Sequence, residues 1–523
     1  MKPPSASFRP WLSCLLFAVA LPVAKSAPTP PAGYAVPAFT DPARRQQVES
    51  VLPDIDKLYR DLATARHIPG LVYGVVLDGQ LIQARAIGWA NLEKKIPAAS
   101  DTRFRIASMT KSFVALATLS LRDAGKLNLD DPVVQYLPEF AAVHVPTADS
   151  PPITLRHLMT MTTGWPEDNP WGDRQMANTK EVMEQLVGAG LSFSNPPGQT
   201  FEYSNLGFML LARIVTKVAG VRFQDYITAK ILQPLGMKNT VWEYADVPAD
   251  KLALGYRWEH DKWQLEPILH DGEGAGLGGI ITTLDDFSRY VAFHLDAWPA
   301  RDDPDTGPVR RATVRELQMP RIFSSAAPRA MLVDGSGPNP SVTFYGYGLS
   351  WTRDSRGVVK IAHSGGLPGY GSIYRLCPDH GVAVIAFGNV RYAPVSATAN
   401  DALNLILERG KLQPRTIPVS AILETRKQQV AALIQSWDPK LVAEITAQNF
   451  LMDRDLADWA QLGREKLAAI GAIQSVGRIV PENQMRGTFP ILGDKGRLDV
   501  SFTLTPEIVP KVQALDFTVA PNR

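Results

Sequence analysis

The pattern of hydrophobic and polar positions predicts a buried helix within residues 105–125. Positions from Phe113 to Leu121 are mostly apolar, no Gly or Pro interrupts them, and Gly125 ends the run. A helix that is apolar on most of its faces lies inside a protein. The first turn of this expected helix holds Ser108.

Regular spacing also predicts elements on either side of this helix. Apolar residues recur every three or four positions through 43–66, which indicates a helix with a break at Pro53. Residues 71–77 and 81–90 have the character of strands and flank Asp78-Gly79, a typical hairpin turn. The same signals predict short strands at 103–106, 358–362, 371–376 and 382–387.

The middle of the chain is mainly helical in its pattern. Residues 153–161 begin at Thr154, a suitable helix cap, and the run stops at Gly164. A second apolar helix is expected at 205–218, closed by Gly220. A Gly- and Pro-rich turn precedes it.

The character of the chain changes near residues 411–419, which we interpret as a Pro-containing linker. Helical spacing covers 420–470, and alternating strands with polar breaks cover 471–520. Residues 420–523 are therefore expected to form a small C-terminal α+β appendage, and helices followed by strands resemble cystatin-like or nuclear-transport-factor-2-like accessory folds. We find no catalytic constellation in it.

The N-terminus has the pattern of a secretory signal peptide. Basic residues precede an apolar run at 11–24, and a small-x-small motif ends just before Ala27. We expect residues 1–26 to be removed on export, residues 27–42 to be a Pro- and Ala-rich linker, and the protein to be periplasmic or secreted. No later run approaches 18 apolar residues, so no transmembrane anchor is expected.

Composition narrows the possible functions. The chain is 45% hydrophobic and 20% charged with a net charge of +2, which is typical of a globular protein and gives no reason to expect nucleic acid as a partner. Cys14 lies in the leader, so Cys377 is left without an intrachain partner and is expected in the core. No His or Cys cluster has metal-ligand spacing, and we expect neither a metal nor a cofactor.

Ser108 and Lys111 are three residues apart, so they share one face of the expected helix. Burial lowers the pKa of a lysine, and a neutral amine can take the proton of a serine hydroxyl near pH 7. The free N–H groups at a helix N-terminus can stabilise an oxyanion. An isolated S-x-x-K is also what a helix cap followed by a surface lysine looks like, but this one opens an apolar helix.

Two further polar pairs can face the serine. Tyr203 and Asn205 lie on the turn before an apolar helix, where a phenol and a carboxamide can point into a cleft; a core tyrosine and a helix-capping asparagine would look the same. His363 follows a strand and precedes two glycines, which favours it over His270 as a third element. A single histidine at a strand end can also be purely structural.

The three motifs, in order, resemble those of the penicillin-recognising serine hydrolases, and the chain is similar to the class C β-lactamase and DD-peptidase branch, the S12 peptidase and esterase group. The motifs are Ser108-x-x-Lys111, Tyr203-x-Asn205 and His363-Ser364-Gly365. The segments ITLRHLMTMTTGW, PGQTFEYSNLGFMLLARIV and AGLGGIITTLDDF look like framework of the same family.

This resemblance implies an α/β (α+β) β-lactamase/transpeptidase-like fold. The expected hydrolase domain covers 43–410: an antiparallel sheet flanked by helices, built from both ends of this region, with a mainly helical insertion at about 126–280. The family usually has lysine in the third motif where this chain has His363. Because imidazole has an ordinary pKa near 6.5, we expect it to be a weaker, pH-dependent anchor for a substrate carboxylate.

The resemblance also implies a role for each residue. Ser108 would be the acylated nucleophile, Lys111 its base and Tyr203 a second proton relay, so the protein would be a serine hydrolase. Asn205, His363, Ser364 and Gly365 would bind substrate, and the backbone N–H groups of Ser108 and Gly366 would form the oxyanion hole. The partner would be a small-molecule or peptide substrate, such as a D-amino-acid peptide derived from peptidoglycan, a small ester or a β-lactam.

Two other interpretations compete with this one. Ala362 to Gly366 mimics the nucleophile elbow of α/β-hydrolases, with Ser364 as nucleophile, although an elbow needs a helix directly after the serine. Alternatively, the protein is a catalytically weak penicillin-binding or sensor-like protein of the same fold. The motifs do not fix the substrate or the oligomeric state.

Overall fold

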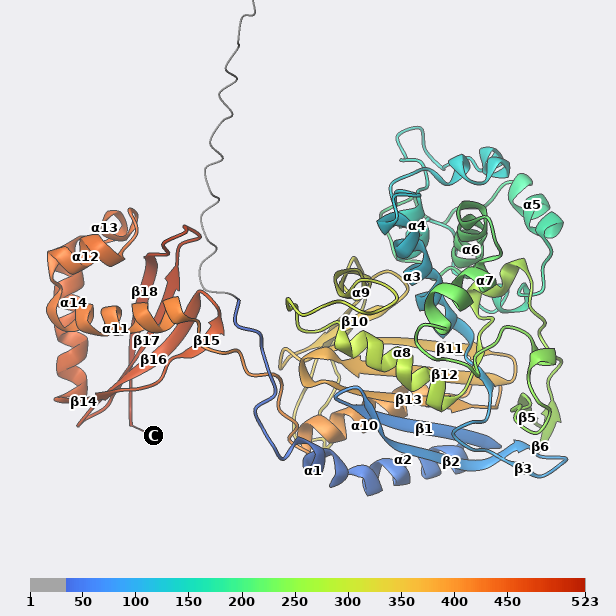
Figure 1. Ribbon diagram of the computed structural model, residues 1–523, viewed down its shortest axis with the longest axis horizontal. Coiled ribbons are helices and arrows are strands. Elements are labelled where there is room, and N and C mark those ends of the chain that lie inside the picture. The colour runs from blue at the N-terminus through green and yellow to red at the C-terminus, as the bar shows by residue number, and fades with distance from the viewer. Residues whose placement is uncertain (1–33, 523) are drawn as a thin grey trace, which may run out of the picture. The chain divides into compact units, whose positions relative to one another are not determined.

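The computed structural model describes residues 34–522. They divide into two compact units: residues 36–416, and residues 417–522 together with 34–35 (Figure 1). The predicted leader, residues 1–26, and the first part of the predicted linker lie outside the described residues.

The first unit is organised around a nine-stranded antiparallel sheet. Its strand order is β3-β2-β1-β13-β12-β11-β10-β9-β8, so a strand from the start of the unit pairs with one from its end: β1 lies beside β13, with Leu71 opposite Gly388. The strands are β1 (Gly70–Leu77), β2 (Gln80–Asn91), β3 (Ile96–Pro97), β8 (Ile322–Ala327), β9 (Ser341–Tyr345), β10 (Ser350–Asp354), β11 (Val359–Leu367), β12 (Tyr370–Cys377) and β13 (Val382–Gly388).

Local sequence signals explain much of this sheet. The predicted hairpin is confirmed: Asp78 and Gly79 both have positive φ, at 50° and 79°, as a tight turn between β1 and β2 requires. Cys377 is buried at the end of β12, as expected.

Both faces of the sheet are covered by helices (Figure 1). On β1, Leu71, Tyr73 and Val75 pack towards α1 (Arg44–Glu49), α2 (Leu52–Ala65) and α10 (Val395–Glu408). The alternate residues Val72 and Val76 pack on the other side, where α8 (Leu284–Asp296) contacts the sheet. Because side chains alternate along a strand, covering both faces requires the unbroken apolar run seen in β1. The helix predicted at 43–66 is divided into two helices, α1 and α2, and Pro53 lies in the first turn of α2.

The central helix α3 (Thr110–Asp123) leaves the sheet region and packs on α6 (Asn205–Ala219). Both helices are buried on most faces, as their apolar sequences predict. Besides α6 and α8, the segment between α3 and β8 holds the short helices α4 (Leu155–Thr160), α5 (Lys180–Gly188), α7 (Phe223–Ile227) and α9 (Arg311–Leu317). It also holds short strands: β5 (Tyr256–Glu259), β6 (Lys262–Leu265) and β7 (Ile281–Thr282), the last paired with β4 (Phe104–Arg105).

The second unit has its own apolar core between helices and an antiparallel sheet. The helices are α11 (Ala421–Ser436), α12 (Pro439–Ile445), α13 (Phe450–Asp453) and α14 (Leu456–Ile470). The strands are β14 (Ile473–Val476), β15 (Val480–Asn483), β16 (Arg486–Gly493), β17 (Arg497–Leu504) and β18 (Val512–Ala520). Helices precede strands, as the spacing predicts.

No helix among residues 34–522 is both long and apolar enough to cross a bilayer.

Candidate active site

Ser108 lies in a single 3₁₀ turn, Ala107–Met109, directly before α3. The preceding Ala107 has a φ of 50°, a left-handed conformation that is uncommon outside glycine. This bend turns the chain out of β4 and places Ser108 where it is only 7% exposed. Ser108 thus stands one turn earlier than the α-helical turn that the sequence predicted.

Lys111 occupies the first turn of α3 and is completely buried. Its Nζ is 2.9 Å from Ser108 Oγ, 2.7 Å from Asn205 Oδ1 and 2.8 Å from the carbonyl oxygen of Leu277. The amine therefore joins the first two predicted motifs directly. Leu277 belongs to the AGLGGIITTLDDF segment, whose glycines let its backbone come close to the nucleophile: a Cβ on Gly278 would stand 3.2 Å from the Ala107 backbone.

Burial lowers the pKa of Lys111 to about 7, and the nearby carboxylates of Asp173 and Asp168 act in the opposite direction. An amine with this pKa is substantially neutral at pH 7 and above. A neutral amine at 2.9 Å has a free lone pair for the Ser108 proton.

Asn205 is fully buried at the start of α6, and a loop containing acidic residues holds it in place. Asp168 Oδ1 accepts the backbone N–H of Asn205 at 2.7 Å, which anchors the helix end. The side-chain amide Nδ2 donates to Asn169 Oδ1 at 2.5 Å and to Asp173 Oδ1 at 3.4 Å. With Nδ2 engaged in this way, Oδ1 faces Lys111.

Tyr203 lies on the turn before α6, as predicted, and its ring is 5.1 Å from Lys111 Nζ. Desolvation raises the pKa of Tyr203 well above its ordinary value, and a hydrogen bond with the Ser108 side chain acts against this rise. The phenol is therefore neutral in the resting protein, and it lies within hydrogen-bonding reach of the serine.

A cavity of about 490 Å³ opens over Ser108. Its lining comes from the nucleophile turn, the loop at 167–173, the turn before α6, β11 and the segment after β13. The lining residues are Ser108, Glu167, Asn169, Pro170, Asp173, Tyr203, Ser364, Gly366 and Tyr392. Neither lysine nor arginine is among these lining residues, whereas two are acidic.

Strand alternation separates the residues of the third motif. Ser364 and Gly366 line the cavity, but His363 and Gly365 do not. A Cβ on Gly365 would lie 2.2 Å from the carbonyl oxygen of Ile106, so this glycine lets β11 pack against the backbone that leads into Ser108. His363 and Gly365 therefore lie on the other side of β11 from Ser364 and Gly366, because successive strand residues point to opposite sides. Substrate contacts by His363 and Gly365 stay a prediction.

His363 also differs in its acid–base behaviour. Its Nδ1 donates to the carbonyl oxygen of Ser364 at 2.6 Å, and its Nε2 accepts from the Tyr345 hydroxyl at 3.1 Å. Burial, with a further contribution from Lys111, lowers the pKa of His363 to about 3. The expectation of an ordinary histidine pKa near 6.5 is wrong, and a pH-dependent anchor near neutrality is not available here.

The structure also bears on the competing interpretations. After Ser364, β11 continues to Leu367 and turns directly into β12, so the helix that a nucleophile elbow requires is absent there. Among the described residues, no group of three or more His, Cys, Asp or Glu side chains could hold a metal ion.

Several residues of the site escaped the sequence analysis. The loop residues Asp168 and Asp173 position Asn205, and Asp173 Oδ2 also accepts from the Tyr392 hydroxyl at 3.0 Å. The Tyr392 ring lies where a Cβ on Gly366 would meet it, at 2.8 Å. An acidic stretch between two tryptophans, WPEDNPW at 165–171, is the sequence signal that could have drawn attention to this loop.

Comparisons with known proteins identify relatives of this chain. The Beta-lactamase family model matches residues 55–408. Protein flp of Staphylococcus aureus (strain MW2) is 27% identical over 359 residues, which cover 67% of this chain and 64% of that protein. Beta-lactamase-like protein 2 of Dictyostelium discoideum is 30% identical over 346 residues, which cover 64% of this chain and 59% of that protein. This chain therefore spans less than two thirds of the length of these relatives.

Solved structures show the same fold. The octameric penicillin-binding protein homologue from Pyrococcus abyssi aligns with a TM-score of 0.58 and 20% identity over 90% of this chain and 98% of that one. The penicillin-binding protein from Bacillus halodurans aligns with a TM-score of 0.52 and 24% identity over 67% of this chain and 98% of that one. The predicted β-lactamase/transpeptidase-like fold is confirmed. With a family match over most of its length, the chain belongs to the Beta-lactamase family.

Proposed function

We propose that this protein is an exported serine hydrolase that cleaves an ester or amide through an acyl-enzyme on Ser108. Members of the family are generally serine hydrolases. The observation that carries the proposal is the 2.9 Å contact between Ser108 Oγ and a buried Lys111 whose pKa is about 7. The pattern of residues 1–26 supports export.

Acylation starts when the Lys111 amine takes the Ser108 proton and Oγ attacks the substrate carbonyl carbon. The new oxyanion is stabilised by backbone N–H groups at Ser108, before α3, and at Gly366, on the cavity wall. When the tetrahedral intermediate collapses, the bond to the leaving group breaks. The leaving group receives the proton from Lys111 through the Tyr203 hydroxyl. Tyr203 acts as a neutral relay, because its pKa is too high for a phenolate to accumulate.

Hydrolysis completes the cycle. A water molecule gives a proton to the Lys111–Tyr203 pair and attacks the ester carbonyl of acyl-Ser108. The product acid leaves when Ser108 Oγ takes its proton back. Asn205 keeps Lys111 directed at Ser108, since its Oδ1 accepts from Nζ at 2.7 Å.

The charge of the cavity favours substrates without a carboxylate beside the scissile bond. Glu167 and Asp173 line it, whereas His363 is neutral and is not among the lining residues. A penicillin or a D-Ala-D-Ala terminus would bring a negative charge towards these carboxylates. We therefore propose small esters, or amides and peptides bound through an uncharged or amino-terminal group, as the preferred substrates.

The test is a panel of acyl donors: a p-nitrophenyl ester, a D-amino acid amide, a D-Ala-D-Ala peptide and a penicillin. Intact mass spectrometry reports the adduct, and product release reports turnover. We expect turnover of the ester or the amide and slower acylation by the two carboxylate-bearing compounds. A stable penicillin adduct without turnover of any donor would instead support a penicillin-binding or sensor-like protein.

A further inference from the structure

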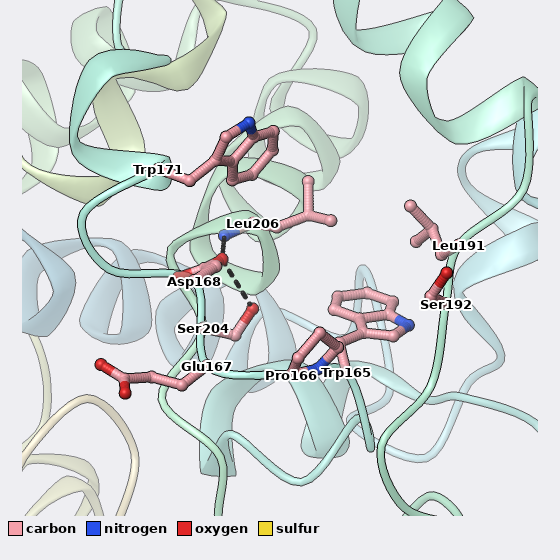
Figure 2. A pocket seen from close by; sticks show the side chains of 9 residues that line it. All are labelled: Trp165, Pro166, Glu167, Asp168, Trp171, Leu191, Ser192, Ser204 and Leu206. Carbon is pink, nitrogen blue, oxygen red and sulfur yellow. Dashed lines mark hydrogen bonds between the residues drawn. The ribbon is translucent and has the colours of Figure 1, made fainter.

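A second cavity, of about 250 Å³, shares Glu167 with the catalytic cavity. Figure 2 shows the residues that line it. Its walls are mostly apolar, with the rings of Trp165 and Trp171 on the loop at 165–171 and the side chains of Leu191 and Leu206 facing them. The cavity volume exceeds the roughly 150 Å³ that admits a benzene molecule in an engineered protein cavity. It is therefore large enough for one aromatic ring or a short alkyl chain with its linker.

The cavity contains a polar group without a partner. Trp165 is only 3% exposed, and its indole Nε1–H has no hydrogen-bond acceptor among residues 34–522. Figure 2 shows this nitrogen on the side of the cavity where Ser192 lies. Buried donors are nearly always paired, so an unpaired one in the wall of a cavity points to an acceptor that arrives with a ligand.

The carboxylate of Asp168 also lines this cavity, but its hydrogen bonds are made within the protein. Asp168 accepts hydrogen bonds from the backbone of Asn205 and Leu206 and from Ser204 Oγ, two of which are drawn in Figure 2. Its role is to hold the start of α6. Of the other polar groups in the lining, those of Trp165, Ser192 and Glu167, the buried indole N–H of Trp165 is a donor and pairs with an oxygen atom.

The two cavities are neighbours along the chain and in space. Glu167 lines both of them. Ser204, which lines the second cavity, stands between Tyr203 of the catalytic cavity and the buried Asn205. The shared Glu167 places the two cavities next to each other.

We propose that this cavity is a subsite for an apolar substituent of the substrate, an aromatic ring or short alkyl chain whose linking carbonyl oxygen accepts the Trp165 indole N–H. This inference rests on the proposed hydrolase function and specifies its substrate class. The substituent can belong to the acyl group or to the leaving group, and the experiment below distinguishes them.

Binding is tested first, apart from catalysis. In the Ser108→Ala protein labelled with ¹⁵N-tryptophan, each tryptophan gives its own indole N–H resonance. The resonance that is missing after the additional change Trp165→Phe belongs to Trp165. Phenylacetamide, which has a ring and a carbonyl, is titrated in. We expect a saturable shift of the Trp165 resonance; no shift, or shifts confined to other tryptophans, would overturn the subsite.

Turnover is tested second with two ester series. One compares p-nitrophenyl acetate with p-nitrophenyl phenylacetate, and the other compares S-methyl with S-benzyl thioacetate. In one of the two series, kcat/KM should be at least about tenfold higher for the ester with the aryl group than for its partner. The Ser192→Trp change fills the cavity and should bring the two values of kcat/KM close together. The matched control Val221→Trp, at an exposed position after α6, should leave the ratio unchanged.

These outcomes separate the two proposals. If neither series depends on Ser192→Trp, the subsite is refuted even when the small esters are hydrolysed. If neither these esters nor any amide, peptide or penicillin of the panel acylates Ser108, the hydrolase proposal fails, and the resonance shift still decides whether the cavity binds an aryl carbonyl compound.

Discussion

Lys111 is the residue whose surroundings determine when Ser108 can react. Two opposing effects set its pKa: burial, which favours the neutral amine, and the carboxylates of Asp173 and Asp168, which favour the ammonium ion. The first is larger. Because only the neutral form can accept the serine proton, kcat/KM should rise with pH and level off above about 7.

Asp173→Asn tests this balance. Removing a negative charge that stabilises the ammonium lowers the pKa of Lys111 further, so the acid limb of the kcat/KM profile should move to lower pH. The variant also alters contacts of Asn205 and Tyr392, and for this reason the measured quantity is the midpoint of the limb rather than the absolute rate. Asp61→Asn, an exposed change on α2, serves as the control. A midpoint that stays in place or rises would contradict the assignment of Lys111 as the base.

Ser108→Ala and Lys111→Ala should each lower kcat by about 10⁴-fold or more, because the two side chains act as one unit. The double variant should be hardly worse than either single one. Steady-state kinetics on the best ester provides the measurement. Additive losses would show that the two residues act independently.

At this scale the motifs predicted that Ser108, Lys111, Tyr203 and Asn205 lie together, because spacing on a helix and on a turn limits where such side chains can lie. They could not predict the state of His363. The Tyr345 hydroxyl hydrogen-bonds to Nε2 of His363, and burial by distant segments lowers the pKa of the imidazole. Neither effect is visible in the motif.

At the scale of elements, close backbone packing positions the nucleophile. β11 passes so near the turn before Ser108 that only glycine fits at 365, where a Cβ would be 2.2 Å from a backbone oxygen. The sequence predicted β11 and α3 separately from their apolar patterns. The sequence could not predict the contact between β11 and the turn before α3, because the sheet brings Gly365 and Ile106 together from distant parts of the chain. The bend at Ala107 also carries no local signal.

Gly365→Ala should therefore destabilise the protein by about 1–3 kcal/mol, the usual cost of overpacking. It should also slow acylation, since the backbone leading into Ser108 must shift. Thermal unfolding and acylation rate are the measurements. Gly188→Ala is the matched control, because a Cβ there meets nothing within 4 Å and alanine suits its position in α5. Equal behaviour of the two variants would contradict the packing argument.

At the scale of the whole molecule, every residue proposed for the chemistry lies in the first unit, 36–416. The boundary after Thr416 falls within residues 411–419, the segment interpreted as a linker. Residues up to 416 belong to the first unit, since Ala38 pairs with Thr416 through two backbone hydrogen bonds and Arg415 packs over Phe39. The order of helices and strands in the second unit follows its sequence pattern, but that pattern gives no function.

We predict that residues 36–416 fold alone and keep the acylation chemistry. The unit has its own sheet and two apolar cores, so its stability does not depend on the second unit. The shortened protein should be soluble and should be acylated by the best ester within a fewfold of the full-length rate. An insoluble product, or a folded one that cannot be acylated, would show that the second unit takes part in the catalytic fold.

The most direct measurement of the central claim is to locate the acyl group. The full-length protein is treated with a slowly hydrolysed ester, stopped with acid, digested with trypsin and mapped by mass spectrometry. Cleavage after Lys and Arg separates peptide 106–111, which contains Ser108, from peptide 361–375, which contains Ser364. We predict the added mass on Ser108, and none in the Ser108→Ala protein. An acyl group on Ser364, or one that persists after Ser108→Ala, would contradict the account.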